Sequence, residues 1–324
     1  ILDKPMPWRY VVGMELNLAT LAKHFSDEAK AWALLESIRW PSGPICPHCA
    51  NAEKHYFLEP QSGYRETSTG KRTYRRVWKC AVCRKQFSVL VGSVFHGSKI
   101  PVSKWLLAVH MMCAGKNGVS ANELHRQLGV TYKTAWFMAH RIRYAMSRGP
   151  LNDRMTGTIE ADETYIGGKG KRRGRPSKDS HKTPVVSLLQ RDGEVRSTVV
   201  ANVTGATLAS VLKEHIDPAA LLMTDEYAAY KQPGQGFAEH ATVNHSQGEY
   251  ARGKVTTNRV EGYFSQLKRS IDGTHHRVSR EHLHRYLGEF DYRYSTRKTT
   301  DGERTARAIR QTAGRRLTYA QPGQ

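Results

Sequence analysis

The stretch MTGTIEADETYIGG, residues 155–168, opens the second half of the chain and decides its fold. Glycines lie near both of its ends, and β-branched and aromatic residues recur between them, which is typical of a β-strand. Two further runs of this kind follow, PVVSLLQRDG and EVRSTVVANV. A helix is then expected over residues 207–215 and a short strand over residues 221–224. Strands followed by this alternating strand and helix pattern predict a mixed α/β sheet.

Three acids stand out in this half of the chain. Asp162 lies in the first strand, and Asp225 directly follows the short strand LLMT. Glu261 lies in TTNRVEGYFSQLKRS, residues 256–270, seven residues before Lys268. Seven residues make about two turns of a helix, so Glu261 and Lys268 share one face. The spacing alone fits a functional site, but it slightly favours an intrahelical network of ion pairs.

Other polar residues near these positions compete for the same role. Glu160 is on the same strand face as Asp162 and is the main competitor, whereas Glu163 and Glu226 are expected to face away. Three further residues are expected either to line the site or, more often, to make structural hydrogen bonds: His245, Asn258 and His276.

The chain carries a strong positive charge. Its 324 residues include 50 Lys and Arg against 29 Asp and Glu, a formal net charge of +21. This excess predicts a polyanion as partner, above all nucleic acid, and a membrane surface is the weaker alternative. No apolar run approaches the roughly 20 residues that span a bilayer, and no signal sequence opens the chain. We therefore expect a cytoplasmic, nucleoid-associated protein without a membrane partner.

Four cysteines form two CxxC pairs, Cys46 with Cys49 and Cys80 with Cys83. Two such pairs, each on a tight turn, can hold one Zn²⁺ ion in tetrahedral geometry. The linker supports this arrangement, because HYFLE and TYRRVWK look like the strands of a hairpin. A redox pair would need a thioredoxin-like βαβ context, which the sequence lacks. We predict a closed, structural zinc site and place the fifth cysteine, Cys113, in an apolar helix core.

A helix-turn-helix is predicted between the cysteines and the sheet. Residues 120–123 form a capping box, Gly129 supplies the turn, and Thr131 caps a second helix. This arrangement fits a DNA-binding pair of helices, and an ordinary helical bundle is the alternative. Three cations of the second helix are the candidates for contacts with phosphates or bases: Lys133, Arg141 and Arg143.

The segment KGKRRGRPSKDSHK, residues 169–182, has no apolar residue to anchor it. We expect a basic loop over residues 168–183. Its Arg-Gly-Arg-Pro core is similar to arms that lie in a narrow minor groove, and a solvated basic loop is an equal alternative. In both cases three arginines are expected to contact the phosphate backbone: Arg172, Arg173 and Arg175.

Taken together, these motifs resemble the zinc-ribbon DDE transposases of bacterial insertion sequences, specifically the insertion-sequence 1595 family with its Merlin relatives. The matching pieces span about residues 20–297 in the family's order: RWPSGPICPHC, CAVCRKQFSVLVGSVFHGSKIPVSKW, IEADETYIGGK, TDEYAAY, VNHSQGEYARG and TTNRVEGYFSQLKRSIDGTHHRVSREHLHRYLGEFDYRY. The resemblance is weakest after Lys298.

The resemblance implies an RNase H-like catalytic domain in which Asp162, Asp225 and Glu261 are the catalytic carboxylates. It also implies a role for Lys268, since a lysine follows the third acid by seven residues in this family. The three acids would hold two Mg²⁺ or Mn²⁺ ions, for which carboxylate oxygens are suitable ligands, and Lys268 would orient a phosphate.

We therefore expect a multidomain α+β protein: an N-terminal zinc ribbon and helix-turn-helix, then an RNase H-like α/β domain with a mixed sheet. The expected segments are a helical segment (1–43), the zinc ribbon (44–98), the helix-turn-helix (99–150), the catalytic domain (151–297) and a basic C-terminal tail (298–324). The expected function is a DNA transposase that binds terminal inverted repeats and catalyses Mg²⁺-dependent cleavage and strand transfer into target DNA, as a homodimer or larger assembly. The alternatives are a catalytically inert DNA-binding regulator and another RNase H-like nuclease.

Overall fold

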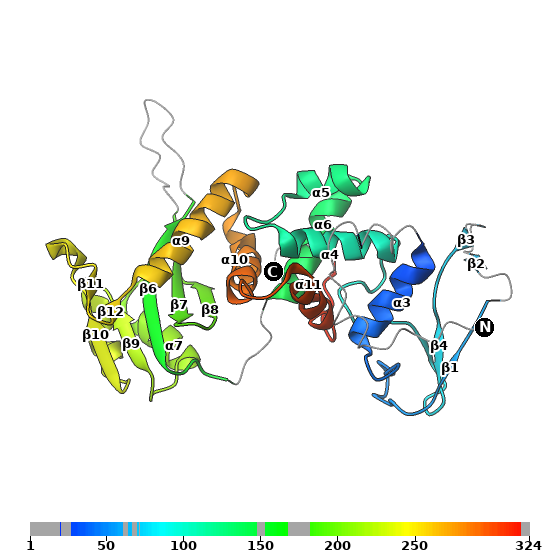
Figure 1. The fold of residues 1–324 in the computed structure, drawn as a ribbon, viewed down its shortest axis with the longest axis horizontal. Coiled ribbons are helices and arrows are strands. Elements are labelled where there is room, and N and C mark those ends of the chain that lie inside the picture. Colours follow the sequence, from blue (N-terminus) through cyan, green and yellow to red (C-terminus); the bar gives the residue numbers. More distant parts are fainter. Residues whose placement is uncertain are drawn as a thin grey trace. The chain divides into compact units, whose positions relative to one another are not determined.

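The computed structural model describes residues 20, 27–60, 64–66, 70, 72–147, 153–167 and 182–318. The chain divides into two compact units (Figure 1). The first unit combines residues 1–146 with residues 299–322, and the second is built from residues 147–298. The predicted arm with Arg172, Arg173 and Arg175 lies outside the described residues, so its contact with DNA stays a prediction.

The first unit joins a small ribbon of short strands to a group of helices. Its strands are β1 (His55–Phe57), β2 (Arg65–Glu66), β3 (Arg72–Thr73), β4 (Trp78–Cys80) and β5 (Gln86–Phe87). Its helices are α3 (Glu28–Arg39), α4 (Val102–Ala114), α5 (Ala121–Leu128), α6 (Tyr132–Met146) and α11 (Asp301–Arg310). Strand β4 pairs antiparallel with both β1 and β5, which gives the hairpin predicted between the two CxxC pairs.

A residue from another helix caps the N-terminus of α4. Pro101 precedes α4 and makes no capping side-chain bond. The carboxylate of Glu28, in α3, instead accepts hydrogen bonds from the N–H groups of Val102 at 2.5 Å and Ser103 at 3.2 Å. A negative charge at this end of a helix is favourable, because the first N–H groups have no partner within the helix.

The two helices predicted as a helix-turn-helix are present as α5 and α6. The Ser120 side chain accepts a hydrogen bond from the N–H of Glu123, and α5 ends at Gly129, which has a left-handed φ of 57°. Thr131 caps α6 by accepting from the N–H of Thr134 at 3.2 Å. The sequence signals for these helix ends were therefore sound, while the contact of the pair with DNA stays a prediction.

Two of the three cations predicted to face DNA from α6 are buried. Arg141 and Arg143 are 5% and 1% exposed. The Arg141 guanidinium donates to the carbonyl of His96 and lies 5.5 Å from the centre of the Trp105 ring, and burial lowers its pKa to about 10. The prediction for these two arginines was wrong because the polar face of α6 is also packed, with long side chains lying along apolar neighbours. Lys133, in the first turn, is exposed.

The segment after Lys298 differs from the expected basic tail. Helix α11 packs within the first unit, where Ile309 is 1% exposed. Arg304 donates to the carbonyl of Cys113 at 2.7 Å, and Thr305 Oγ1 lies 3.1 Å from Nδ1 of His110. The first unit is therefore assembled from both ends of the chain.

The second unit is built around a five-stranded sheet with the order β10-β9-β6-β7-β8. Its strands are β6 (Thr158–Ile166), β7 (Thr183–Gln190), β8 (Val195–Val199), β9 (Leu221–Thr224) and β10 (Glu239–Thr242), and β11 (Ala251–Arg252) forms a separate hairpin with β12 (Val255–Thr256). Its helical elements are α7 (Gly205–His215), η1 (Ala228–Tyr230), α8 (Lys231–Gly234), η2 (His245–Gln247), α9 (Asn258–Ser270), η3 (Ile271–His275) and α10 (Arg280–Ser295). Strands β6, β7 and β8 are antiparallel, and β9 and β10 run parallel to β6, which confirms the predicted mixed sheet.

Helices cover both faces of this sheet (Figure 1). Ile159 and Ala161 of β6 pack on one face with α7, while α9 and α10 pack on the other face. Successive side chains of a strand alternate between faces. Glu160 and Asp162 therefore point toward the face covered by α9 and α10.

None of the helices bounded above, in the part of the chain that the structure describes, has the length and the apolar character needed to cross a bilayer.

Candidate active site and metal centre

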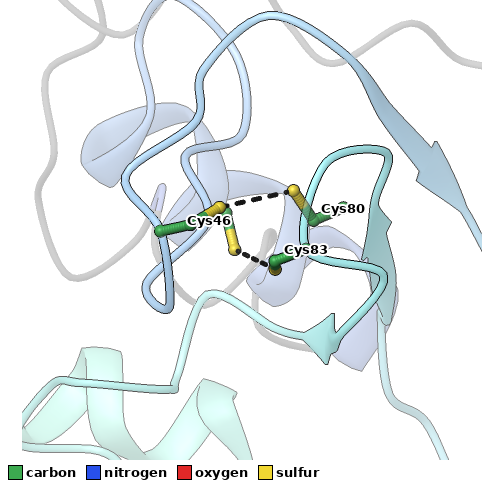
Figure 2. A group of neighbouring side chains, drawn as sticks. Cys46, Cys80 and Cys83 are labelled. Carbon is green, nitrogen blue, oxygen red and sulfur yellow. Dashed lines mark hydrogen bonds between the residues drawn. The ribbon is translucent and has the colours of Figure 1, made fainter.

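Two tight turns bring four cysteine side chains together in the first unit (Figure 2). The Sγ atoms of Cys46 and Cys83 are 3.6 Å apart, as are those of Cys49 and Cys80, and all four lie within 4.8 Å of one another. A tetrahedral Zn²⁺ ion with Zn–S bonds of about 2.3 Å needs sulfur atoms about 3.8 Å apart. The cysteine set therefore supports the predicted structural zinc ion.

The two turns are closed in the same way. The residue after each CxxC pair, Ala50 and Arg84, has a positive φ of 57° and 59°. The N–H groups of these residues donate to the carbonyls of Cys46 and Cys80, at 2.9 Å and 3.1 Å. The left-handed residue reverses the chain, so that both thiols of a pair face the same point.

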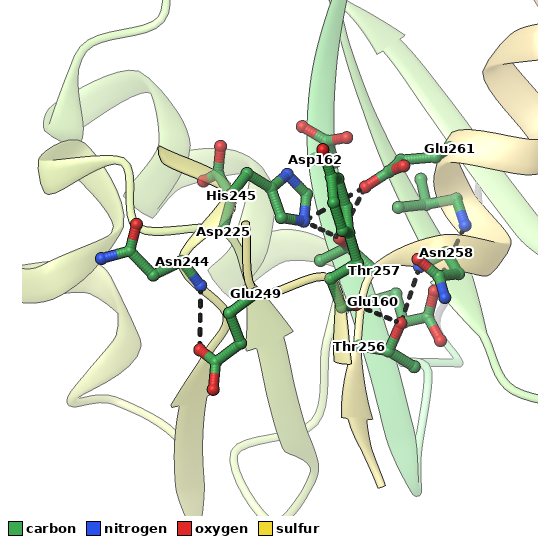
Figure 3. Close-up of polar contacts among 12 residues, drawn as sticks. Glu160, Asp162, Asp225, Asn244, His245, Glu249, Thr256, Thr257, Asn258 and Glu261 are labelled. Carbon is green, nitrogen blue, oxygen red and sulfur yellow. Dashed lines mark hydrogen bonds and ion pairs between the residues drawn. The ribbon is translucent and has the colours of Figure 1, made fainter. Parts of the chain in front are cut away.

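Three carboxylates from distant parts of the chain converge in the second unit (Figure 3). Asp162 lies in β6, and Asp225 follows β9, the parallel neighbour of β6. Glu160 pairs with Met223 in this ladder, so extending the register by two residues sets Asp162 beside Asp225. Glu261 lies near the start of α9, on the sheet face toward which Asp162 points.

The environment of Asp162 strongly disfavours its charged form. Burial raises the pKa of Asp162 to about 8, against a hydrogen bond of 2.7 Å from the N–H of Glu163 that lowers it. The negative charges of Glu163, Asp225 and Glu261 raise this pKa further. Like charges that act on one another in a buried place are stabilised by a cation between them.

Asp225 shows the same effect more weakly. Burial raises its pKa, while a hydrogen bond of 3.0 Å from the N–H of Tyr227 lowers it. The charges of Glu226 and Glu261 raise the pKa, and His245 lowers it. Asp225 and Asp162 therefore belong to one electrostatically coupled group with Glu261.

Two residues hold Glu261. The hydroxyl of Thr257 donates to Oε1 of Glu261 at 2.9 Å, and Nε2 of His245 lies 3.4 Å from the same oxygen. His245, one of the residues predicted either to line the site or to be structural, thus lies against a candidate ligand. No sequence signal singled out Thr257, which precedes α9 but makes no capping bond to it.

Glu160, the main competitor of Asp162, makes structural contacts. Its side chain is fully buried and accepts hydrogen bonds from Nε of Arg191 at 2.8 Å and from the N–H groups of Arg259 and Val260 at 2.9 Å and 3.2 Å. Glu160 therefore neutralises a cation and caps α9 from the neighbouring strand. Strand alternation places Glu160 and Asp162 on one face but does not tell these two environments apart.

The two acids expected to face away do make other contacts. Glu163 accepts a hydrogen bond of 2.8 Å from the hydroxyl of Tyr230, which packs in the core on the α7 face. Glu226 accepts from the Ser246 hydroxyl and from the N–H groups of Ser246 and His245, and these bonds lower its pKa to about 2. Glu226 thus anchors the turn that carries His245.

The other predicted site residues lie farther along the same segment. Lys268 is exposed on α9, two turns beyond Glu261, and its contact with a phosphate stays a prediction. Asn258 is the exposed first residue of α9. Nδ1 of His276 lies 3.0 Å from the carbonyl of Asp272, which is a structural contact.

The donor set of the second unit suits a hard divalent cation. Carboxylate oxygens are the ligands that Mg²⁺ prefers. The pKa values of Asp162 and Asp225 are raised first by burial and then by the neighbouring carboxylates, so their ionised forms would be favoured by a bound cation. Within the described residues, only the four cysteines form a group of potential ligands that all lie within 4.8 Å. The three carboxylates do not form such a group among the described residues, so their binding of metal ions stays a proposal.

Two family models match the chain. Residues 154–295 match the ISXO2-like transposase domain of the IS1595 type, and residues 26–86 match the transposase zinc-ribbon domain of the same type. The chain carries both domains of an IS1595-type transposase. The first match contains the three carboxylates of this transposase, and the second contains its four cysteines.

Individual relatives agree with this assignment. An uncharacterized protein in transposable element ISH50, from Halobacterium salinarum, is 29% identical over 287 residues, which cover 84% of this chain and 92% of that protein. An uncharacterized transposase-like protein of Haemophilus influenzae is 26% identical over 102 residues, which cover 32% of this chain and 81% of that protein. A solved simian T-cell lymphotropic virus intasome in complex with PP2A regulatory subunit B56 gamma has a TM-score of only 0.29 and 13% identity, over 57% of this chain and 66% of that chain.

Proposed function

We propose that this transposase cuts DNA at the terminal inverted repeats of an insertion sequence and joins the cut ends to target DNA. The observation that carries the proposal is the convergence of Asp162, Asp225 and Glu261, which come from a strand, from the end of its parallel neighbour and from a helix on the same sheet face (Figure 3). The strand order and directions agree with the RNase H-like domain that the family resemblance implies.

In this proposal the three carboxylates are ligands for two Mg²⁺ or Mn²⁺ ions. Bound ions of this kind activate a hydroxyl for attack and offset the charge that develops on the phosphate. Asp162 is the residue best suited to be shared, because the charges of both Asp225 and Glu261 act on it. Thr257 and His245 keep Glu261 in place, and Lys268 contacts a phosphate of the bound strand.

Two displacements at phosphorus follow from this assignment. In the first, a water oxygen attacks the phosphorus at the end of the element, the bond to the 3′ oxygen breaks, and a free 3′-hydroxyl and a 5′-phosphate result. In the second, this 3′-hydroxyl attacks a phosphorus of the target, and the target's own 3′ oxygen leaves. The first step is a hydrolysis, in which one phosphodiester bond is lost and a proton of the water ends on the leaving 3′ oxygen. The second step replaces one phosphodiester bond by another, and the proton of the attacking 3′-hydroxyl ends on the target's 3′ oxygen. Water is thus the one co-reactant.

DNA binding is assigned to the basic first unit and to the basic arm. The candidates are the zinc ribbon, the α5–α6 pair with exposed Lys133, and the arm with Arg172, Arg173 and Arg175. Two ends must be handled together during transposition, so we propose a homodimer or larger assembly on DNA.

Purified protein, a duplex carrying the element's end and a plasmid target test the proposal. We expect the wild-type protein to nick the duplex and join it to the plasmid only with Mg²⁺ or Mn²⁺. The variants Asp162→Asn, Asp225→Asn and Glu261→Gln should bind the duplex and yield no product above background. Glu214→Gln, at an exposed acid of α7, is the matched control and should be fully active.

The same assay separates the alternatives. Binding without metal-dependent nicking by the wild-type protein would identify an inert DNA-binding regulator. Nicking without any joining to the plasmid would identify another RNase H-like nuclease.

A further inference from the structure

An exposed tyrosine lies beside the carboxylate site and has no role in the chemistry above. Tyr250 is 60% exposed, and it immediately precedes the β11–β12 hairpin. Its ring centre lies 5.3 Å from that of His245, with the ring planes tilted by 33°. His245 in turn lies against Glu261. The two aromatic rings thus lead outward from the candidate metal ligand Glu261.

The segment that carries Tyr250 is firmly held. Arg191 donates to the carbonyl of Lys254 at 2.7 Å and to that of Thr256 at 3.1 Å, and the hydroxyl of Thr256 donates to the carbonyl of Tyr250 at 3.1 Å. Arg191 is itself fixed by the buried carboxylate of Glu160. The exposed ring is therefore pre-organised for a contact, which lowers the entropy cost of binding.

Two cations accompany the ring on the same short segment. The side chain of Arg252 is 62% exposed, and Lys254 is exposed at the tip of the hairpin. The nearby acid, Glu249, accepts a hydrogen bond from the N–H of Asn244 at 3.1 Å, and its other carboxylate oxygen lies 3.7 Å from the Arg252 guanidinium. Arg252 also donates to the carbonyl of Thr242 at 2.9 Å, so its position is fixed while most of its side chain stays exposed. An exposed aromatic ring interleaved with cations fits a strand of nucleic acid, whose bases stack on the ring while its phosphates meet the cations.

We propose that Tyr250 stacks on a nucleobase next to the scissile phosphate, and that Arg252 and Lys254 contact the flanking phosphates. The stacked base is one that has left the duplex, because both faces of a paired base are covered by its neighbours. This inference rests on the proposed function for the identity of the ligand as DNA.

Photo-crosslinking tests the contact directly. The full-length Asp162→Asn protein is bound to a duplex with the element's end, in which the two nucleotides at the cut position are unpaired and carry 5-iodo-2′-deoxyuridine. Irradiation followed by mass spectrometry of the peptides should place the crosslink on Tyr250. Tyr250→Phe should keep the crosslink, since the ring remains, and Tyr250→Ala should lose it.

Affinity gives a second measurement. In the wild-type background, Tyr250→Ala should weaken binding of the DNA with unpaired nucleotides by between about 5-fold and about 150-fold, and leave binding of the fully paired duplex unchanged. Tyr165→Ala is the matched control, because Tyr165 is 50% exposed but alternates to the opposite face of β6 from Asp162. It should change neither affinity.

Crosslinks at Tyr227 or elsewhere without Tyr250, or equal weakening of both DNAs by Tyr250→Ala, would overturn the inference. The Asp162→Asn protein needs no catalysis to crosslink, so the two proposals fail separately. A crosslink on Tyr250 together with a wild-type protein that never nicks DNA would contradict the proposed transposition chemistry and leave the stacking contact supported. Nicking by the wild-type protein without this crosslink would contradict the stacking contact of Tyr250 and leave the proposed chemistry supported.

Discussion

Asp162 and Glu160 are two residues apart on one face of β6, and their neighbours give them opposite properties. Glu160 is met by a guanidinium and two helix N–H groups. Asp162 is buried, accepts one hydrogen bond from a backbone N–H, and is repelled by the negative charges of three other acids. The first environment stabilises a carboxylate in the protein itself, while the second leaves a carboxylate that a cation from solution can stabilise.

The metal-free protein should be stabilised by Asp162→Asn. The pKa of Asp162 is about 8 in the folded state and about 3.9 in an unfolded chain. Between these pH values the folded state keeps a proton that the unfolded state has lost, so stability falls as pH rises through this window. In urea unfolding without added Mg²⁺, the variant should exceed the wild type by more than about 1 kcal/mol at pH 8 and match it at pH 4.

Two controls accompany this measurement. Glu214→Gln, at an exposed position, should behave as the wild type at both pH values. Added Mg²⁺ should stabilise the wild type and narrow its difference from Asp162→Asn. A variant less stable than the wild type at pH 8 would show that Asp162 has a structural role instead.

Glu160→Ala should have the opposite effect. It leaves Arg191 without its carboxylate partner and removes the cap of α9, so we expect a loss of about 3–5 kcal/mol in the free energy of unfolding. Urea unfolding at pH 7 measures this loss, with Glu214→Ala as the exposed control. A loss below about 1 kcal/mol would mean that Glu160 is not the cap and counter-ion described above.

At the scale of elements, the sequence predicted the strand and helix bounds that depend on local residue patterns. The strand LLMT, residues 221–224, and the helix expected over residues 207–215, which is α7, appear with nearly the predicted bounds, because apolar periodicity and capping residues act over a few positions. Because the end of this strand was predicted well, the position of Asp225 directly after it was predicted well too. The three-acid site itself was predicted from the family resemblance, since the spacing along the chain slightly favoured an intrahelical ion-pair network.

Features that depend on remote packing escaped prediction. The strands β11 and β12 have two residues each, too few for a periodic signal, and Arg191 holds their hairpin from another part of the sheet. Arg141 and Arg143 lie on a face of α6 that is polar by composition but covered in the fold. The contact of His245 with Glu261 likewise joins two segments, and the sequence pattern does not predict how close they lie in space.

The zinc ribbon should depend on its metal. Its strands have two or three residues each, which is too little structure to hold the two CxxC turns together without the ion. Cys83→Ser should therefore release zinc and open residues 44–98 to proteolysis, while Cys113→Ser, at a buried cysteine outside the cluster, should keep one zinc ion per chain. Metal analysis and limited proteolysis with mass spectrometry distinguish the two variants.

At the scale of the whole molecule, the chain leaves the first unit at residue 146 and returns to it at residue 299. The core of that unit therefore needs helix α11 as well as the helices that precede the sheet. Arg315 extends this arrangement, since its side chain donates to the carbonyls of Tyr144 and Ala145 at 2.7 Å and 3.0 Å.

Core substitutions should act on one unit at a time. Ile309→Ala, in α11, should lower the free energy of unfolding by about 2–5 kcal/mol and raise amide hydrogen exchange in α4. Leu212→Ala, in α7, should lower the free energy of unfolding by a similar amount and raise amide hydrogen exchange in β6 and β9. Hydrogen exchange read by mass spectrometry checks both, and exchange that rises equally in both units for either variant would contradict the division.

The return of the chain sets an order of events during synthesis. The ribosome completes the sheet and all three candidate metal ligands before it makes α11, so the second unit can fold while the first still lacks one of its helices. A ribosome that stalls between residues 298 and 310 would therefore carry a complete second unit together with a first unit that still lacks α11. Completion of the first unit waits for the end of translation, whereas completion of the second unit does not.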